Sequence, residues 1–334
     1  MRQYVFNVFD QFNGTKEQRP INPIGTDLTA LMRQFVRKIL RTLLGFVILT
    51  LAGLVLIALS TNFTLKLEQK SFGHMTHWGS SFARIDEFEG WAHQKPTQAR
   101  GLIIGSSTAY RNINPYILSS ATHIDWFNFG SSGQPPKISY FLLQDAFKKT
   151  KLDYVLLDIY PDIIDLEGLE SAHDLVYNSR LHPWLKTQLV LRYPNAKLLL
   201  RYLYFYTKRC IPSKAHVVSN PAYGRYTGKG FVCTDSLALS RFDSITKTQR
   251  VADFETLHDI AALCKQHGTK LILNISPELG KVYRLDPNYR KFMVMSSPNF
   301  KNPQHFYDSH HMTCEGANLY SEGVVRKLLE CLKK

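Results

Sequence analysis

The sequence contains few cysteines, and their spacing predicts no covalent or metal framework. Five cysteines occur in 334 residues and none belongs to a C-x-x-C pair, so neither a disulfide scaffold nor a cysteine zinc site is indicated. The glycine-rich G-x-x-x-x-G-K loop that binds nucleotide phosphates is also missing. We therefore expect no cofactor and no metal. With 44% apolar and 20% charged residues, the chain has the composition of a protein that folds around a hydrophobic core.

Acidic residues are scarce relative to basic ones, and one long segment has no charge at all. The chain has 27 Asp and Glu against 41 Lys and Arg, a formal charge of +14, which indicates a nucleic-acid partner or an anionic surface. No charged residue occurs from Thr42 to Leu65. At ~1.5 Å rise per residue, a helix over residues 43–60 matches the ~30 Å hydrocarbon core of a bilayer, and we interpret it as a transmembrane helix. A cleaved signal peptide is the main alternative, because Ala58-Leu59-Ser60 is a small-x-small triplet.

The charges beside this segment predict its orientation. Four cations lie in the ten positions before it, namely Arg33, Arg37, Lys38 and Arg41. Because basic residues are retained on the cytoplasmic side, residues 1–42 are predicted to be a cytoplasmic tail of a single-pass protein of the cytoplasmic (inner) membrane. Everything after residue 60 is then extracytoplasmic. The basic excess of that part faces lipid head groups and envelope polymers, so we expect contact with the membrane and no nucleic-acid partner.

The remaining pattern is that of an alternating α/β protein. Residues 61–99 are interpreted as a connector to a domain over residues 100–334. There, short apolar runs at 102–104, 124–128, 154–159 and 270–275 alternate with helical patterns such as 138–149 and 250–266. This alternation predicts a three-layer sandwich with a parallel sheet, whose ligand site lies at the carboxyl ends of the strands. A helical insertion over about residues 163–249 interrupts the pattern.

Polar residues that suit nucleophilic catalysis fall at those carboxyl ends. Gly105-Ser106-Ser107 follows the first run, and a serine at a strand-to-helix turn gains from nearby backbone N–H groups, which stabilise an oxyanion. Near the C-terminus, Asp308 and His311 have D-x-x-H spacing, in which the carboxylate holds one ring nitrogen and leaves the other free to accept a serine proton. Two alternatives stay open: Ser106 as a helix cap with Ser107 buried, and His310 as the base.

The motifs together resemble a known superfamily. IIGSSTAYRNINP, the Asn128–Gly133 segment N-F-G-S-S-G, a strand followed by Pro277, and FYDSHHMTCEGA occur in the order typical of SGNH/GDSL hydrolases. Within them the chain resembles the membrane-anchored branch of DltD-type proteins and polysaccharide O-acetyltransferases. The resemblance implies a flavodoxin-like SGNH fold, Ser107 as nucleophile, and an oxyanion hole formed by the N–H groups of Ser107 and Gly133.

The third motif of that superfamily departs from the pattern. Its usual asparagine has no clear counterpart, because DIYPDI offers only Asp162 or Tyr160, and an ionised Asp cannot donate a hydrogen bond. Asp162 is the position that the motif order places there. According to the resemblance, such a departure is more typical of the acyl-transfer branches than of hydrolases.

Two functions from different classes follow. The first is a membrane-anchored extracytoplasmic serine acyltransferase or esterase that acts on O-acyl groups of cell-envelope or secreted polysaccharide through an acyl-serine intermediate. The second is a non-catalytic accessory that binds envelope polymer or assists a membrane-bound O-acyltransferase.

The insertion and the cysteines each allow more than one interpretation. The insertion is rich in Tyr, Leu, Arg and Lys, which suits stacking on sugar rings, a lid against the membrane or a membrane protein, or a helical cap with its own core. Cys210 and Cys233 either pair with each other or stay independent thiols, and Cys314 is interpreted as a packing residue.

Overall fold

The computed structural model describes residues 24–59, 78–177, 183–193, 195, 198–199, 202, 224–234, 238–242, 246–296 and 300–332. The chain forms two units, Met1–Gly53 and Leu54–Lys334. All described residues of the first unit, 24–53, belong to one helix. The second unit contains the sheet and all the residues of the candidate site.

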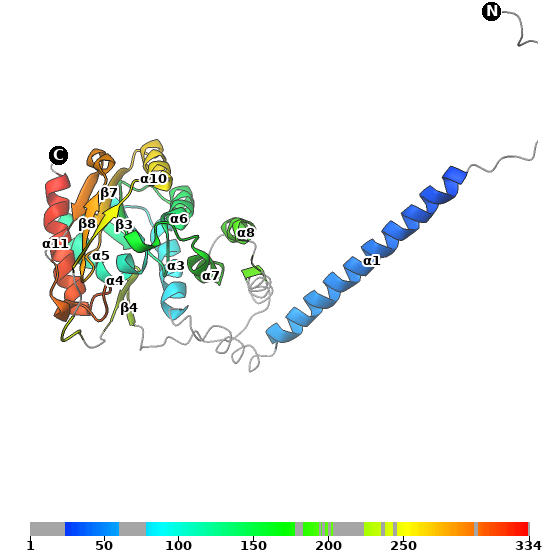
Figure 1. Ribbon diagram of the computed structural model, residues 1–334, viewed down its shortest axis with the longest axis horizontal. Coiled ribbons are helices and arrows are strands. Elements are labelled where there is room, and N and C mark those ends of the chain that lie inside the picture. The colour runs from blue at the N-terminus through cyan, green and yellow to red at the C-terminus, as the bar shows by residue number, and fades with distance from the viewer. Residues whose placement is uncertain are drawn as a thin grey trace, which may run out of the picture. The chain divides into compact units, whose positions relative to one another are not determined.

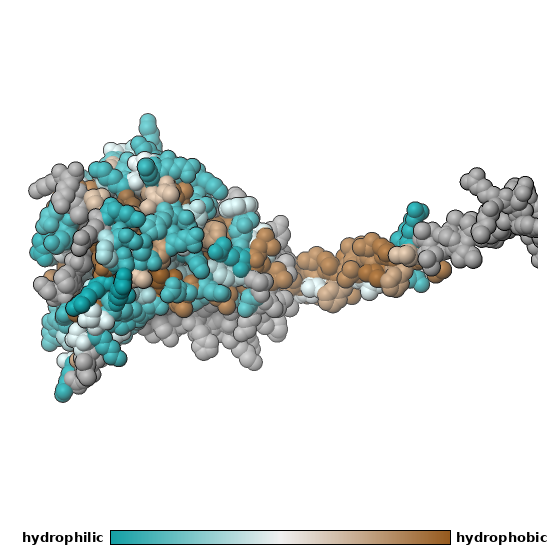
Figure 2. Space-filling view, turned by 45° about the horizontal axis from the view of Figure 1, so that its top comes forward, coloured by the Kyte–Doolittle hydropathy of each residue, from teal (hydrophilic) through white to brown (hydrophobic). Residues whose placement is uncertain are grey.

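Helix α1 (Ile24–Leu59) begins well before the predicted residue 43 and continues to the end of the apolar run. The most apolar 18-residue window of its Ala30–Leu56 stretch has a mean hydropathy of 2.3, and none of that window is buried within the chain. Figure 2 shows the helix as apolar over most of its length, with polar residues toward its N-terminal end. A helix that is apolar on all sides needs an apolar environment. The predicted N-terminal apolar helix is therefore confirmed, and its length and composition suit a membrane anchor or a signal sequence.

Five parallel strands form the main sheet of the second unit. They are β1 (Arg100–Gly105), β2 (Asp125–Asn128), β3 (Tyr154–Ile159), β7 (Lys270–Ile275) and β9 (Met293–Ser296). Their spatial order is β2-β1-β3-β7-β9, with parallel pairing throughout. Counted along the chain this is the flavodoxin-like order 2-1-3-4-5, which confirms the predicted fold class. Strand β9 was not predicted.

Helices cover both faces of this sheet (Figure 1). On one face lie α3 (Trp78–His93), α6 (Pro136–Lys149) and α10 (Glu255–Gln266). On the other lie α4 (Ser107–Asn112), α5 (Pro115–Thr122) and α11 (Cys314–Leu332). Successive strand residues alternate between two cores, since Leu102 and Ile104 pack on the first face and Ile103 on the second. The strands are buried on both faces, as in other parallel sheets enclosed by helices.

Helix α3 lies inside the stretch that the sequence indicated as a connector. Its Ile85, Phe88, Trp91 and Ala92 are buried in the first core, so the core of the domain begins before residue 100. These apolar positions recur at i, i+3 and i+6/i+7, which places them on one face of the helix. In the sequence, charged residues lie between them and make this pattern hard to recognise. Trp91 also donates a 2.6 Å hydrogen bond to Asp125 at the start of β2, which ties the helix to the sheet.

The described parts of the insertion are both helical and extended. They comprise α7 (Leu169–Tyr177), α8 (Pro183–Arg192), β4 (Arg225–Gly228), β5 (Phe231–Cys233) and β6 (Lys247–Val251). Strands β4 and β5 form an antiparallel hairpin, and β6 pairs with β8 (Lys281–Leu285). Short 3-10 turns occupy Pro161–Ile163, Pro287–Lys291 and Pro303–His305. Because Leu185 and Leu189 join the first core and Phe231 the second, these parts complete the main domain rather than forming a separate cap.

Candidate active site

The turn between β1 and α4 exposes one serine from an otherwise buried segment. Every residue from 100 to 113 is buried except Ser107, which is partly exposed. Gly105 allows this turn, because a Cβ there would lie 2.5 Å from the Asp158 carbonyl oxygen of the adjacent strand β3. Ser106 is only 1% exposed and its side chain makes no cap bond. Ser106 does occupy the N-cap position of α4, as the alternative predicted, but Ser107 is not buried, so that part of the alternative is wrong.

A second turn brings a histidine and a carboxylate to this serine. The bridge between Phe306 and Met312 closes the turn. Asp308 Oδ2 lies 2.7 Å from His311 Nδ1, and His311 Nε2 lies 2.7 Å from Ser107 Oγ. With the carboxylate as acceptor, Nδ1 carries the proton and Nε2 accepts from the serine hydroxyl. The three predicted catalytic residues thus meet in the Ser–His–Asp arrangement, with roles recognised by geometry.

His310 points elsewhere. Its Nδ1 lies 2.9 Å from Ser309 Oγ, and its ring stacks on Tyr160 with centroids 5.0 Å apart. Its backbone N–H donates to Asp308 Oδ1 at 2.9 Å. His310 therefore packs beside the histidine–serine pair without reaching the nucleophile, as the D-x-x-H spacing predicts.

Burial and hydrogen bonding set the charge states of Asp308 and His311. Burial lowers the pKa of His311 to about 4, against the opposing attraction of Asp308. For Asp308, burial acts to raise the pKa, but the hydrogen bond from His311 and the N–H groups of His310 and His311 outweigh it and hold the pKa well below its ordinary value. At neutral pH the carboxylate is ionised and the imidazole is neutral, which is the state that a general base requires.

Asn112 is a residue of the candidate site that the sequence analysis missed. It is fully buried, its Nδ2 donates to the His310 carbonyl at 2.8 Å, and its Oδ1 accepts from the Met312 N–H at 3.0 Å. Asn112 ends the same short helix that Ser107 begins. One rigid turn therefore positions both the nucleophile and the loop that carries the base. The only signal in the sequence is its place in the YRNINP part of the first motif.

A buried carboxylate lies behind the nucleophile. Asp158, at the end of β3, accepts from Thr108 Oγ1 at 2.6 Å, Asn274 Nδ2 at 2.6 Å and Ser276 Oγ at 2.9 Å. Burial raises the pKa of Asp158, and these donors act in the opposite direction. The network joins the carboxyl ends of β3 and β7 to the residue after Ser107, and so orients the first turn of α4.

Gly133, the predicted oxyanion donor, lies in the loop after β2 with φ of 53°, a conformation that favours glycine. A Cβ there would lie 2.9 Å from Glu170 Oε2. The same loop is held against β1, because the Ser131 N–H donates to the Gly105 carbonyl at 3.1 Å. The role of the Gly133 N–H stays a prediction.

Asp162 takes part in a charged contact outside the serine–histidine pair. It accepts from Lys281 Nζ at 2.5 Å and from Gln249 Nε2 at 3.1 Å. Burial acts to raise its pKa, but the hydrogen bonds from Lys281 and Gln249 outweigh it, so the pKa is lowered. An ionised Asp162 has no proton to donate. Tyr160 is the other candidate for this motif. Its hydroxyl lies 3.4 Å from Asp162 Oδ2, and its ring stacks on the ring of His310.

The structure corrects the interpretation of the cysteines. Cys233 pairs with Cys314, with Cα atoms 5.1 Å apart across a sequence separation of 81 residues. Cys314 is thus not a mere packing residue, and Cys233 does not pair with Cys210, which lies outside the described residues. The pairing follows from where β5 lies against the start of α11, which no sequence spacing indicates. Cys264 is a buried free thiol, and burial raises its pKa to about 12.

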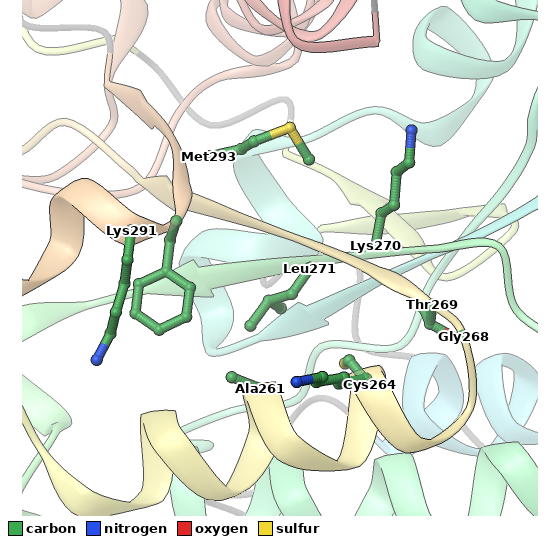
Figure 3. A pocket seen from close by; sticks show the side chains of 10 residues that line it. Ala261, Cys264, Gly268, Thr269, Lys270, Leu271, Lys291 and Met293 are labelled. Atoms are coloured by element: carbon green, nitrogen blue, oxygen red, sulfur yellow. The ribbon is translucent and has the colours of Figure 1, made fainter. Parts of the chain in front are cut away.

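Two other features do not extend the site. Side-chain ligand atoms of Asp308, His310 and His311 lie within 4.8 Å of one another, but both His311 ring nitrogens already contact Asp308 and Ser107. A hollow of about 430 Å³ lies between α10 and β9 (Figure 3). Its Gly268–Leu271 wall belongs to the amino end of β7, whereas Asn274 and Ser276, which contact Asp158, belong to the carboxyl end.

Comparison with known proteins concerns the fold. No family model matches this chain, and no curated protein does. Similar solved structures include a protein described as lipolytic, of the G-D-S-L family, from Desulfitobacterium hafniense DCB-2 (10% identity, 69% of this chain and 99% of that chain, TM-score 0.35). A second is a protein described as an acylhydrolase from Bacteroides fragilis NCTC 9343 (12% identity, 75% of this chain and 98% of that chain, TM-score 0.37). A third is a GDSL-like lipase from Bacteroides thetaiotaomicron VPI-5482 (9% identity, 74% of this chain and 97% of that chain, TM-score 0.35). Sequence identities and TM-scores this low support no conclusion about activity. The assignment of the fold class rests on the strand order of the main sheet.

We predict that His311, and not His310, is the general base. His311→Ala should slow phosphonylation of Ser107 by at least ~100-fold, because general-base catalysis contributes about that much, and His310→Ala should slow it by less than about tenfold. The measurement is the rate at which a fluorophosphonate labels the serine in each variant. A large loss in His310→Ala with little change in His311→Ala would reverse the assignment.

The low pKa of His311 predicts an unusual acid limit. Protonation of His311 removes its capacity to accept the Ser107 proton, so the labelling rate should fall through pH of about 4 and not near the ordinary value of 6.5. Activity is therefore expected to be retained from neutral pH down to about 5. A pH series of labelling rates tests this, with circular dichroism at each pH to exclude unfolding. A half-loss near 6.5 in folded protein would contradict it.

Proposed function

We propose that this protein is a membrane-anchored, extracytoplasmic serine acyltransferase or esterase of the SGNH type, which acts on O-acyl groups of cell-envelope or secreted polysaccharide. One observation carries the proposal: Ser107 Oγ lies 2.7 Å from His311 Nε2, while Asp308 holds the other ring nitrogen. A neutral imidazole between a carboxylate and a partly exposed serine hydroxyl is the arrangement needed to activate that hydroxyl.

The reaction follows in two halves. Ser107 Oγ attacks the acyl carbonyl carbon while His311 Nε2 accepts the serine proton, and the N–H groups of Ser107 and Gly133 are proposed to stabilise the oxyanion. Collapse breaks the bond to the leaving oxygen, which takes the proton from His311, and an acyl-serine remains. An acceptor hydroxyl then gives its proton to His311 and attacks the acyl carbon, and the bond to Ser107 Oγ breaks as that oxygen takes the proton back from His311.

Other features favour a carbohydrate acceptor at the cell surface. The apolar helix α1 would keep the domain beside the membrane, and the basic excess of the chain suits anionic envelope polymers. Asp162, bound to Lys281, is no substitute for a neutral oxyanion donor. A membrane-bound O-acyltransferase would be a suitable partner to deliver the acyl group. The non-catalytic accessory role would leave the contact between Ser107 and His311 without a purpose.

The first test is covalent labelling. A fluorophosphonate probe should label the native full-length protein in detergent and fail to label Ser107→Ala, because phosphonylation requires an activated serine. Ser106→Ala is the matched control, since Ser106 is buried in the same turn, and it should still be labelled. Equal labelling of native protein and Ser107→Ala would exclude Ser107 as the nucleophile.

The identity of the acceptor gives a second prediction. An oxyanion hole that lacks one side-chain donor loses ~3–4 kcal/mol of transition-state stabilisation, so we expect slow hydrolysis of small activated esters. Adding an oligosaccharide acceptor should raise turnover and yield an acylated sugar, because a bound acceptor supplies positioning energy. Product analysis by mass spectrometry decides the outcome. Fast ester hydrolysis with no response to carbohydrate would favour a membrane-anchored esterase.

Topology gives a third prediction. Protease added to intact spheroplasts should digest the chain beyond residue 70, because four cations precede the apolar segment on the retained side. A cytoplasmic marker must stay intact in the same sample, and survival of the domain would show that the orientation is wrong. An epitope at the N-terminus should remain on the full-length chain before protease is added. Its separation from the domain would identify a cleaved signal sequence.

A further inference from the structure

The Cys233–Cys314 disulfide joins two segments that both border the proposed catalytic turn. Cys233 ends β5, in the hairpin of the insertion, and Cys314 begins α11, three residues after His311. The Cys314 N–H also donates to the Thr234 carbonyl at 3.1 Å. The end of β5 is therefore fastened directly to the chain that leaves the catalytic turn.

Contacts lead from this junction to the His311 ring. Arg111, which is 4% exposed, donates to Thr234 Oγ1 at 2.8 Å. Its guanidinium lies 5.7 Å from the centroid of the Tyr307 ring, and Tyr307 in turn stacks on His311 with centroids 5.6 Å apart and planes 13° from parallel. Each member is packed against the next, so the position of Thr234 bears on the orientation of the imidazole.

The catalytic turn is thus held from two sides. On one side Asn112 binds the His310 carbonyl and the Met312 N–H. On the other, the disulfide keeps β5 and Thr234 against the start of α11. We propose that the Cys233–Cys314 disulfide acts as a positioning pair, which holds the Asp308–His311 turn on Ser107, so that the catalytic arrangement is completed only when these two cysteines are oxidised. This inference rests on the proposed function.

Formation of the Cys233–Cys314 disulfide determines in which cellular compartment the protein would be active. The two thiols lose two electrons and two protons to a disulfide oxidant, which becomes two thiols, and one S–S bond forms between Cys233 and Cys314. Cytosolic thiol pools keep cysteines reduced, whereas extracytoplasmic compartments allow disulfides to persist. A chain still in the cytoplasm would therefore have a catalytic turn held by Asn112 but not by the disulfide, and it would gain full activity after translocation.

The test compares oxidised and reduced full-length protein in detergent. Reduction with dithiothreitol should slow fluorophosphonate labelling of Ser107 by about 10- to 100-fold, since small misplacements of a catalytic group have effects of this size, and oxidised glutathione should restore the rate. Cys233→Ser/Cys314→Ser should label slowly in both conditions. Cys264→Ala, which removes a buried thiol outside this junction, is the matched control and should respond to the reductant as the native protein does.

A pH series separates positioning from general loss of structure. In folded reduced protein the opened turn exposes His311 to water, so the acid limit of labelling should move from about 4 toward 6.5. Circular dichroism and melting curves of the same samples show whether the fold persists. A lower rate with an unchanged acid limit would overturn the positioning role, because it would indicate damage elsewhere.

Hydrogen exchange provides a readout that does not need activity. The Met312 and His311 N–H groups are bound to Asn112 and Asp308, and they should exchange faster after reduction. Equal labelling rates and equal exchange before and after reduction, with thiol titration showing that both cysteines were reduced, would contradict the inference. If oxidised protein is not labelled at Ser107 at all, the proposed function fails, and the exchange data alone then decide whether the disulfide holds the turn.

Discussion

The short helix α4 is the constraint on which the candidate site depends. It carries Ser107 at its first position and Asn112 at its last, and both side chains contact the same turn of the chain, through His311 and through the backbone at 310 and 312. A single helix of six residues leaves little freedom between these two ends. The distance between Ser107 and His311 is therefore set by one rigid element, although about 200 residues separate them in the chain.

The burial around α4 explains how a polar site is maintained. The buried Asp158 has three side-chain donors, and the buried Arg111 has Thr234 and two tyrosine rings. Buried charges are costly when they lack partners, so these contacts are needed for the site to exist in the interior. The two apolar cores on either face of the sheet supply the burial that stabilises this arrangement.

The described parts of the insertion contribute structure to the candidate site, and no reacting group is found among their residues. Its β4–β5 hairpin packs against the end of β2, the edge strand of the main sheet, where Gly230 lies so close to the Asn128 carbonyl that a Cβ would overlap it. This packing delivers Thr234 and Cys233 to the catalytic turn. A segment that the sequence indicates as an addition to a common fold thus becomes part of the support for His311.

The sequence by itself determined the features that depend on local pattern. Hydrophobic runs located four of the five strands of the main sheet, an uncharged run located the apolar helix, and the D-x-x-H spacing selected His311 over His310, because these signals arise from residues close together in the chain. Only the tertiary structure decided the rest. The role of Asn112, the pairing of Cys233 with Cys314, the burial of α3 in the core and the ion pair of Asp162 with Lys281 all depend on which distant segments come into contact, and neither composition nor spacing contains that information.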